Sequence, residues 1–168
     1  MRFFLYSVLA LLLFSGCGYK PSSYYAKKAI DGKVYVDLVM NMDNTRNTVL
    51  VKDAMNALIL NEFSAKLTNN KEEADTYVVI SLSGVSHSSI NTGDDGYTDS
   101  YRTTVVVNIK YTKKGLKTKS LNVSDYYDFS VDSDSVVTDQ KKKTAVKNAA
   151  AKALDNLFSK IAVQNIKE

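Results

Sequence analysis

Three consecutive segments of alternating apolar and polar residues dominate the second half of this chain. They run from Asp75 to Ile90, from Tyr101 to Tyr111 and from Lys117 to Val131. A period of two places successive side chains on opposite faces of a strand, so each segment predicts a strand with one buried face. The short turn at Lys113-Lys114-Gly115 joins the last two segments as a hairpin. The sequence therefore predicts a largely antiparallel sheet at the centre of the fold.

Two polar residues within these segments lead to separate predictions. Asp125 interrupts the apolar face of the third segment, which predicts an edge strand or a bulge there. His87, the one histidine of the chain, falls between the apolar positions of the first segment. We therefore expect His87 on the more exposed face of the sheet, as a surface residue.

Two stretches with helical spacing accompany the sheet. Thr138 to Ile161 predicts a helix with one apolar stripe, and Val49 to Leu67 predicts a helix with two. In the second helix, Leu60 and Phe63 belong to a stripe nearly opposite the main one. We expect this stripe to pack either against neighbouring loops of the same chain or against a partner. Glu62 falls within the main apolar face, where its charge has no evident purpose.

The order of these segments predicts the fold class. Val34 to Met42 alternates as a further strand, which gives the order βαβββα. We expect an α+β two-layer sandwich, in which two helices cover one face of a four-stranded, mostly antiparallel sheet. A helical connection follows the first strand, so that strand can pair in parallel. Residues 33–168 are expected to form this single domain.

The N-terminus predicts export and lipidation. Arg2 precedes an apolar run, and Ser15-Gly16 precede Cys17, the only cysteine. This pattern is typical of a secretory signal peptide and resembles the lipobox of bacterial lipoproteins. We expect residues 1–16 to be removed, Cys17 to be acylated and residues 17–32 to form a lipidated tether. An ordinary signal peptide or a signal anchor is the alternative, although the run is shorter than the ~20 residues of a membrane span.

Charge narrows the class of partner. The formal net charge is +4, which favours anionic partners, and export argues against nucleic acid. Lysines bind phosphates as flexible point charges, so the basic clusters predict contact with anionic lipid head groups, or else a solvated surface. The candidates for such contact with lipid head groups, including lipopolysaccharide, are Lys113, Lys114, Lys141, Lys142 and Lys143.

Tyrosine and apolar residues predict a protein partner. The chain has 11 tyrosines, a residue type that suits partner surfaces because it is both apolar and able to hydrogen-bond. The candidates for partner contact are Tyr35, Tyr101, Leu60 and Phe63.

Signatures of catalysis are missing from the sequence. One histidine and one cysteine that is expected to be acylated exclude most Cys-His catalytic sites and multi-histidine metal sites. The acidic loop with Asp94, Asp95 and Asp99 lacks the spacing of a calcium-binding EF-hand. We therefore expect no enzymatic activity, no cofactor and no metal.

Four short motifs make the chain resemble a known family. They are Cys17-Gly18-Tyr19-Lys20-Pro21, Ala74-Asp75, Tyr101-Arg102-Thr103 and Tyr126-Tyr127-Asp128-Phe129. Together with the order of the elements, they resemble the LPS-assembly lipoproteins, the LptE family, in the short form of Campylobacter-like bacteria.

This resemblance implies a structural and binding role. A member of the family sits as a plug inside the outer-membrane β-barrel LptD, helps that barrel to fold and binds lipopolysaccharide through basic residues near one end of the domain. Here the acidic loop departs from a basic lipid-contacting loop, and Arg102 and Lys141 to Lys143 are the nearest candidates. Gly18 after the cysteine, in place of an acidic residue, favours the outer membrane. The alternatives are another small periplasmic lipoprotein, such as an adaptor or envelope-stress factor, and a hydrolase.

Overall fold

The computed structural model describes residues 20–39, 45–92, 98–131 and 137–166. These form one mixed five-stranded sheet with three helices, and the strand order is β2-β1-β3-β4-β5. The elements are α2 (Ser22–Ala29), β1 (Lys33–Val39), α3 (Thr45–Leu58), the π-helical turn η2 (Ile59–Phe63), β2 (Lys66–Leu67), β3 (Thr76–Thr92), β4 (Thr98–Lys113), β5 (Lys119–Ser130) and α4 (Asp139–Ile166).

The predicted α+β class is confirmed, but two elements were missed. The sheet has five strands, because the two-residue β2 pairs in parallel with β1, and α2 adds a third helix. β1 also pairs in parallel with β3, as its helical connection allowed. β3, β4 and β5 are antiparallel, and β5 is an edge strand that pairs with β4 without a register shift. The edge explanation for Asp125 is therefore confirmed, and the bulge explanation is wrong.

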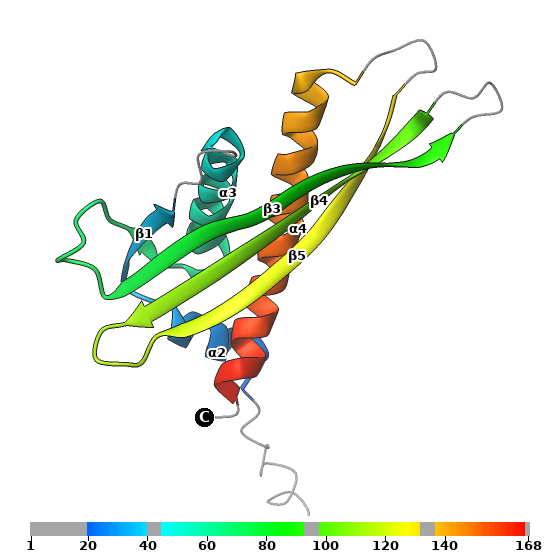
Figure 1. The fold of residues 1–168 in the computed structure, drawn as a ribbon. Coiled ribbons are helices and arrows are strands. Elements are labelled where there is room, and N and C mark those ends of the chain that lie inside the picture. The colour runs from blue at the N-terminus through cyan, green and yellow to red at the C-terminus, as the bar shows by residue number, and fades with distance from the viewer. Residues whose placement is uncertain (1–19, 40–44, 93–97, 132–136, 167–168) are drawn as a thin grey trace, which may run out of the picture.

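Helices cover one face of this sheet. Figure 1 shows α3 and α4 on the same side, with the opposite face of β3, β4 and β5 left uncovered by the described elements. The small side chains of α4 allow its backbone to approach the strands closely, and its buried stripe includes Ala149, Ala150, Ala153, Leu154 and Leu157. The stripe meets the alternating inner residues of the strands, among them Val78, Ile80, Val105, Val107 and Ile109.

The predicted tether, residues 17–32, is helical from Ser22 to Ala29. α2 packs against α4, and Ala26 and Ile30 are fully buried. An eight-residue helix is marginal on its own, so this contact with α4 supplies its stability. The folded domain therefore begins at Ser22, eleven residues before the expected boundary at residue 33.

The first predicted helix ends in a π-helical turn. α3 gives way to η2 at Ile59, and one extra residue in a helical turn rotates every later side chain. As a result Glu62 is exposed, whereas Phe63 enters the core at 2% exposure. Leu67, expected in the same helix, lies in β2.

A bulge in β3 likewise changes the direction of the side chains that follow it. The register with β4 shifts between Leu82 and Gly84, so the side chains that follow change faces. His87 pairs with Thr103, which is buried on the helix side of the sheet. The prediction that His87 lies on the outer face is therefore wrong, although the residue is exposed because the helices do not cover this part of β3.

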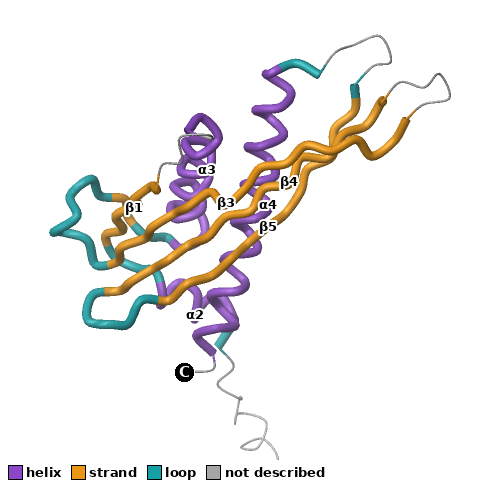
Figure 2. The backbone as a smooth tube through the Cα atoms, viewed as in Figure 1, coloured by secondary structure: helices purple, strands orange, loops and turns teal. Residues whose placement is uncertain are grey.

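Two regions of the sheet differ in the number of strands and helices that pack beside them. We call the part where β1 and β2 are present the base, and we call residues 84–92, 98–106 and 124–130 the arm. The last described residue of β1, Val39, pairs with Ser81, so among the described residues the arm has three strands with an open edge on each side. Figure 2 shows the arm projecting to one side, away from α3 and α4.

Candidate functional site

Two of the sequence motifs face each other across the arm. In the β4–β5 register, Tyr101 pairs with Phe129, Arg102 with Asp128 and Thr103 with Tyr127. Nothing in the sequence alone connected the two motifs. Arg102 and Asp128 both lie on the outer face, and the register between β4 and β5 brings them together.

Arg102 is held by its neighbours on that outer face. Its Nε and Nη2 atoms donate to the two carboxylate oxygens of Asp128, each at 2.7 Å, and its guanidinium lies 3.7 Å from the centroid of the Tyr126 ring. These hydrogen bonds lower the pKa of Asp128 and raise the pKa of Arg102. The positive charge of Arg102 is therefore already matched by a carboxylate, which makes it a weaker anion ligand than its sequence position predicts.

The opposite face of the arm carries aromatic and imidazole groups. Tyr101 and Phe129 stack with their ring centroids 5.8 Å apart. His87 Nδ1 lies 2.8 Å from Thr103 Oγ1. Partial burial of the imidazole, and then the charge of Lys142, lower the pKa of His87. The imidazole of His87 is therefore uncharged at neutral pH.

The lysine triplet lies at the same end of the molecule. Lys141 Nζ is 3.5 Å from the carbonyl oxygen of Ser130, the last residue of β5. Lys142 is exposed, and Lys143 is half-buried. We call these lysines and Arg102, which points to the opposite face of the sheet, the basic group around the arm.

The two remaining basic candidates lie at the other end. Lys113 follows Arg102 by eleven residues along β4, which is roughly 36 Å in an extended strand. Its ammonium group pairs with Asp31 at 2.6 Å, while Lys114 is exposed in the β4–β5 turn. The six predicted lipopolysaccharide-binding residues thus form two groups, and no single site holds all of them.

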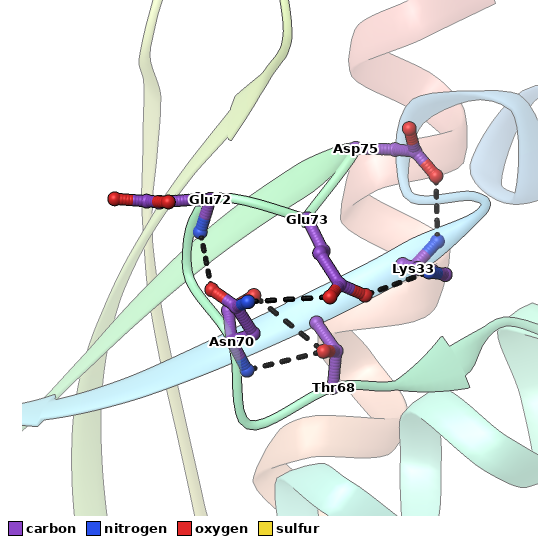
Figure 3. Close-up of polar contacts among 6 residues, drawn as sticks. All are labelled: Lys33, Thr68, Asn70, Glu72, Glu73 and Asp75. Atoms are coloured by element: carbon purple, nitrogen blue, oxygen red, sulfur yellow. Dashed lines mark hydrogen bonds and ion pairs between the residues drawn. The ribbon is translucent and has the colours of Figure 1, made fainter.

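A clamp at the base explains the Ala74-Asp75 motif. Asp75 Oδ2 accepts the backbone N–H of Lys33 at 2.8 Å, and Lys33 Nζ pairs with Glu73 at 2.8 Å (Figure 3). The ion pair raises the pKa of Lys33 and lowers the pKa of Glu73. Asn70 donates to Glu73 and so braces the loop from within. The clamp fixes the start of β1 beside β3, and the motif is structural.

The four predicted partner-contact residues occupy different environments. Tyr35 stacks on Tyr77 on the outer face of the base, with ring centroids 5.6 Å apart. The phenol of Tyr77 also donates a short hydrogen bond to Asp37, which raises the pKa of Tyr77 to about 12. Leu60 is 52% exposed on η2, whereas Phe63 is buried. In the described chain, Phe63 therefore presents no surface to a partner.

Phe63 and Tyr101 each have a partner ring within the chain. Phe63 packs edge-on against Phe158 of α4, with ring centroids 5.0 Å apart. Tyr101 is half-buried against Phe129. Of the four predicted contacts, Leu60 is exposed, Tyr35 and Tyr101 are half-buried, and Phe63 is buried.

The sheet face that the described helices leave uncovered is rich in polar side chains. Alternation and register place hydroxyl and amide side chains along β3, β4 and β5 on this face. Asn108 Nδ2 donates to Asn122 Oδ1 at 2.6 Å across two of these strands. The main members of the face are Ser81, Ser86, Ser88, Thr104, Asn108, Thr112, Ser120, Asn122, Ser124 and Tyr126.

Some predictions concern residues outside the described ranges or side chains that are not described. Cys17, Gly18, Asp94 and Asp95 lie outside those ranges, and the side chain of Asp99 is not described. Within the described ranges, no group of three or more metal-ligating side chains occurs. None of the helices in this part of the chain is long and apolar enough to cross a bilayer.

Comparison with known proteins identifies the family. The family model described as lipopolysaccharide-assembly, LptE, matches residues 32–161, well over half of the chain. The chain belongs to the LptE family. Rare lipoprotein B from Shewanella oneidensis shares the fold of this LptE-family chain, with a TM-score of 0.50 and 15% identity over 80% of this chain and 97% of the other.

Two further solved structures are similar to this LptE-family chain. A putative lipoprotein from Caulobacter crescentus CB15 has a TM-score of 0.48 and 11% identity, over 88% of this chain and 97% of the other. Lipoprotein B from Nitrosomonas europaea has a TM-score of 0.48 and 10% identity, over 87% and 91% of the two chains. No curated protein sequence matches the chain.

Proposed function

We propose that this LptE-family protein is an outer-membrane lipoprotein subunit of the lipopolysaccharide export machinery. In this role it is anchored through Cys17, plugs an LptD-like β-barrel, assists the assembly of that barrel and binds lipopolysaccharide. It carries out no covalent chemistry. The family assignment over residues 32–161 supports the general role in lipopolysaccharide assembly.

The uncovered polar sheet face is the observation that carries the plug proposal. The lumen of a large outer-membrane barrel is polar, so a plug needs a surface that hydrogen-bonds rather than one that excludes water. Hydroxyl and amide groups such as those of Thr104, Asn108 and Asn122 meet this requirement. Few charges interrupt them, and the central charge on the arm, Arg102, is paired with Asp128.

The basic group around the arm supports the lipid-binding part of the proposal. Lys141 and Lys142 are exposed, and both lie near the end of β5. The phosphates of lipopolysaccharide are ligands for such ammonium groups. We assign the first contact to these lysines and a secondary contact to Arg102, whose guanidinium is shared with Asp128.

Purification of the full acylated chain from native outer membranes tests the partner. We expect a large β-barrel protein to co-purify in stoichiometric amount, identified by mass spectrometry. Recovery of the chain without a barrel contradicts the plug role and favours the adaptor or envelope-stress alternative.

Crosslinking tests which surface meets the barrel. A photo-crosslinking residue at Asn122 lies on the polar sheet face, and the matched control at Lys147 lies on the exposed side of α4. We expect crosslinks to the barrel from residue 122 in greater yield than from residue 147. The reverse order contradicts the assignment of the sheet face.

A further inference from the structure

A second basic site lies at the base, outside the proposed lipopolysaccharide contact. A pocket of about 510 Å³ opens between α2, the β4–β5 hairpin and the C-terminal end of α4, which Figure 1 places at one end of the molecule. Four lysines line it, and no acidic residue does. The residues on which the argument rests are Tyr25, Lys28, Lys113, Leu116, Lys117 and Lys119.

The lysines of this pocket differ in how they are engaged. Lys113 is paired with Asp31, and Lys119 donates to the amide oxygen of Asn165 at 2.9 Å. Lys28 and Lys117 are exposed and have no acidic partner among the described residues. The pocket therefore presents two ammonium groups without a carboxylate, with two further lysines that are held in place by neighbours.

The remaining lining suits an amphipathic ligand. Leu116 is 64% exposed at the pocket, and the half-buried Tyr25 ring adds apolar surface beside the lysines. Ammonium groups bind phosphate, whereas the apolar groups suit the glycerol and the first methylenes of a lipid. The volume falls within the range of small-molecule binding pockets.

The position of the pocket relates it to the membrane. Helix α2 begins at Ser22, five residues after Cys17, and five residues span at most about 18 Å. This step rests on the proposed acylation of Cys17. An anchor at Cys17 keeps α2, and with it Lys28 and Tyr25, within reach of the head groups of the same leaflet.

We propose that this pocket binds the phosphate of an anionic phospholipid head group in the membrane that carries the anchor. Lys28 and Lys117 contact the phosphate, and Leu116 and Tyr25 contact the apolar part next to it. The acyl anchor alone leaves the domain free to rotate, whereas a head group bound at the base fixes which end faces the membrane. The arm then points away from that surface.

A single tryptophan tests this proposal, because the chain has none. The full acylated chain carrying Leu116→Trp is reconstituted into vesicles of phosphatidylcholine alone or of an equal mixture with phosphatidylglycerol. We expect acrylamide quenching of this tryptophan to fall about twofold in the anionic vesicles. Adding Lys28→Glu and Lys117→Glu should remove the difference. The matched control, Lys66→Glu with Lys147→Glu at two exposed positions away from the pocket, changes the net charge equally and should keep the difference.

Further measurements separate the outcomes. Equal quenching in both vesicles, or an unchanged effect in the Lys28 and Lys117 variant, overturns the proposal. The same protection from inorganic phosphate in phosphatidylcholine vesicles assigns the pocket to a free phosphate and overturns the lipid assignment. Vesicle flotation in high salt reports the acyl anchor independently. Chains that fail to float contradict the acylation of Cys17, whereas floating chains without protection contradict only the pocket.

Discussion

The base and the arm are built from the same three strands but are stabilised differently. In the base, Val78 and Ile80 of β3 are fully buried beneath helices, and β1 and β2 extend the sheet on one side. In the arm, Thr103 and Val105 of β4 are still buried on the helix side, but β3 residues 86–91 are exposed and pair with β4 at an open edge of the described sheet. Tyr101 and Phe129 supply the stacked aromatic contact there.

This difference separates stability from recognition. A buried, densely packed region tolerates few changes, because substitution leaves a cavity or causes a clash. The exposed positions of the arm can vary at little cost to folding, unlike Thr103 and Val105, which are buried on its helix side. We therefore expect the buried residues of the base to determine whether the chain folds, and the exposed side chains of the arm to affect the lipopolysaccharide contact more than folding.

The isoleucine pair in β3 gives the largest expected contrast. Ile80 is fully buried in the base, and Ile90 is 47% exposed in the arm. Ile80→Ala should lower the free energy of unfolding by about 2–5 kcal/mol, since it opens a cavity, and Ile90→Ala by about 0.5 kcal/mol. Urea denaturation measures both. Equal losses would show that the arm is packed as firmly as the base.

Two glycines give the next contrast. Gly32 has φ +69°, and a Cβ there would lie 2.3 Å from Asp75 Oδ2, the acceptor of the base clamp. Gly32→Ala should therefore cost about 2 kcal/mol of unfolding free energy. At Gly84, where the arm starts, a Cβ would meet no neighbouring atom of the described chain within 4 Å. Gly84→Ala should change stability by less than about 0.5 kcal/mol. A similar melting temperature for both variants would contradict the clamp.

Removing the carboxylate partner of one basic residue at each end of the molecule compares how the two basic groups contribute to lipopolysaccharide binding. Asp128→Asn leaves the charge of Arg102 without its carboxylate in the arm, and Asp31→Asn does the same for Lys113 in the base. We expect Asp128→Asn to raise lipopolysaccharide affinity about two- to threefold and Asp31→Asn to leave it unchanged. Titration with lipopolysaccharide at fixed salt measures this. A larger effect of Asp31→Asn would place lipopolysaccharide at the base.

The smallest expected effect is a pH dependence in the arm. The pKa of His87 is lowered by burial and by Lys142, so below about pH 6.5 the unfolded chain binds a proton more readily than the folded chain. Stability should therefore fall as the pH drops from about 6.5 to the lowered pKa, and level off below it. The dependence should weaken in His87→Gln, measured as the urea midpoint against pH. An unchanged dependence would assign it to other groups.

Sequence periodicity predicted the long elements because each has a continuous pattern. The strand segments starting at Asp75 and Tyr101 correspond to β3 and β4, and the helix predicted from Thr138 corresponds to α4. α2 and β2 were missed because eight and two residues carry too little pattern, and their positions depend on contacts with α4 and β1.

The errors about side-chain direction have a common cause. One extra residue in β3 between Leu82 and Gly84 turns His87 toward the helix side of the sheet, and the π-helical turn at Ile59 turns Phe63 into the core. Periodicity assumes a constant step, so it fails after each such irregularity. The site could be predicted only in part for a related reason. The sequence shows that Arg102 is basic, but only the β4–β5 register shows that Asp128 lies beside it and balances its charge.

The parallel pairing of β1 with β3 has a consequence for the order of assembly. The clamp residues Lys33 and Asp75 are 42 residues apart, whereas β3, β4, β5 and α4 follow one another along the chain. Closing the longer loop costs more chain entropy, so we expect the hairpins and α4 to form first and β1 to join last. Pulse-labelling hydrogen exchange would show late protection of β1, and early protection would exclude this order. With the proposed anchor at Cys17, β1 would then be added to the sheet while the chain is held next to the membrane surface.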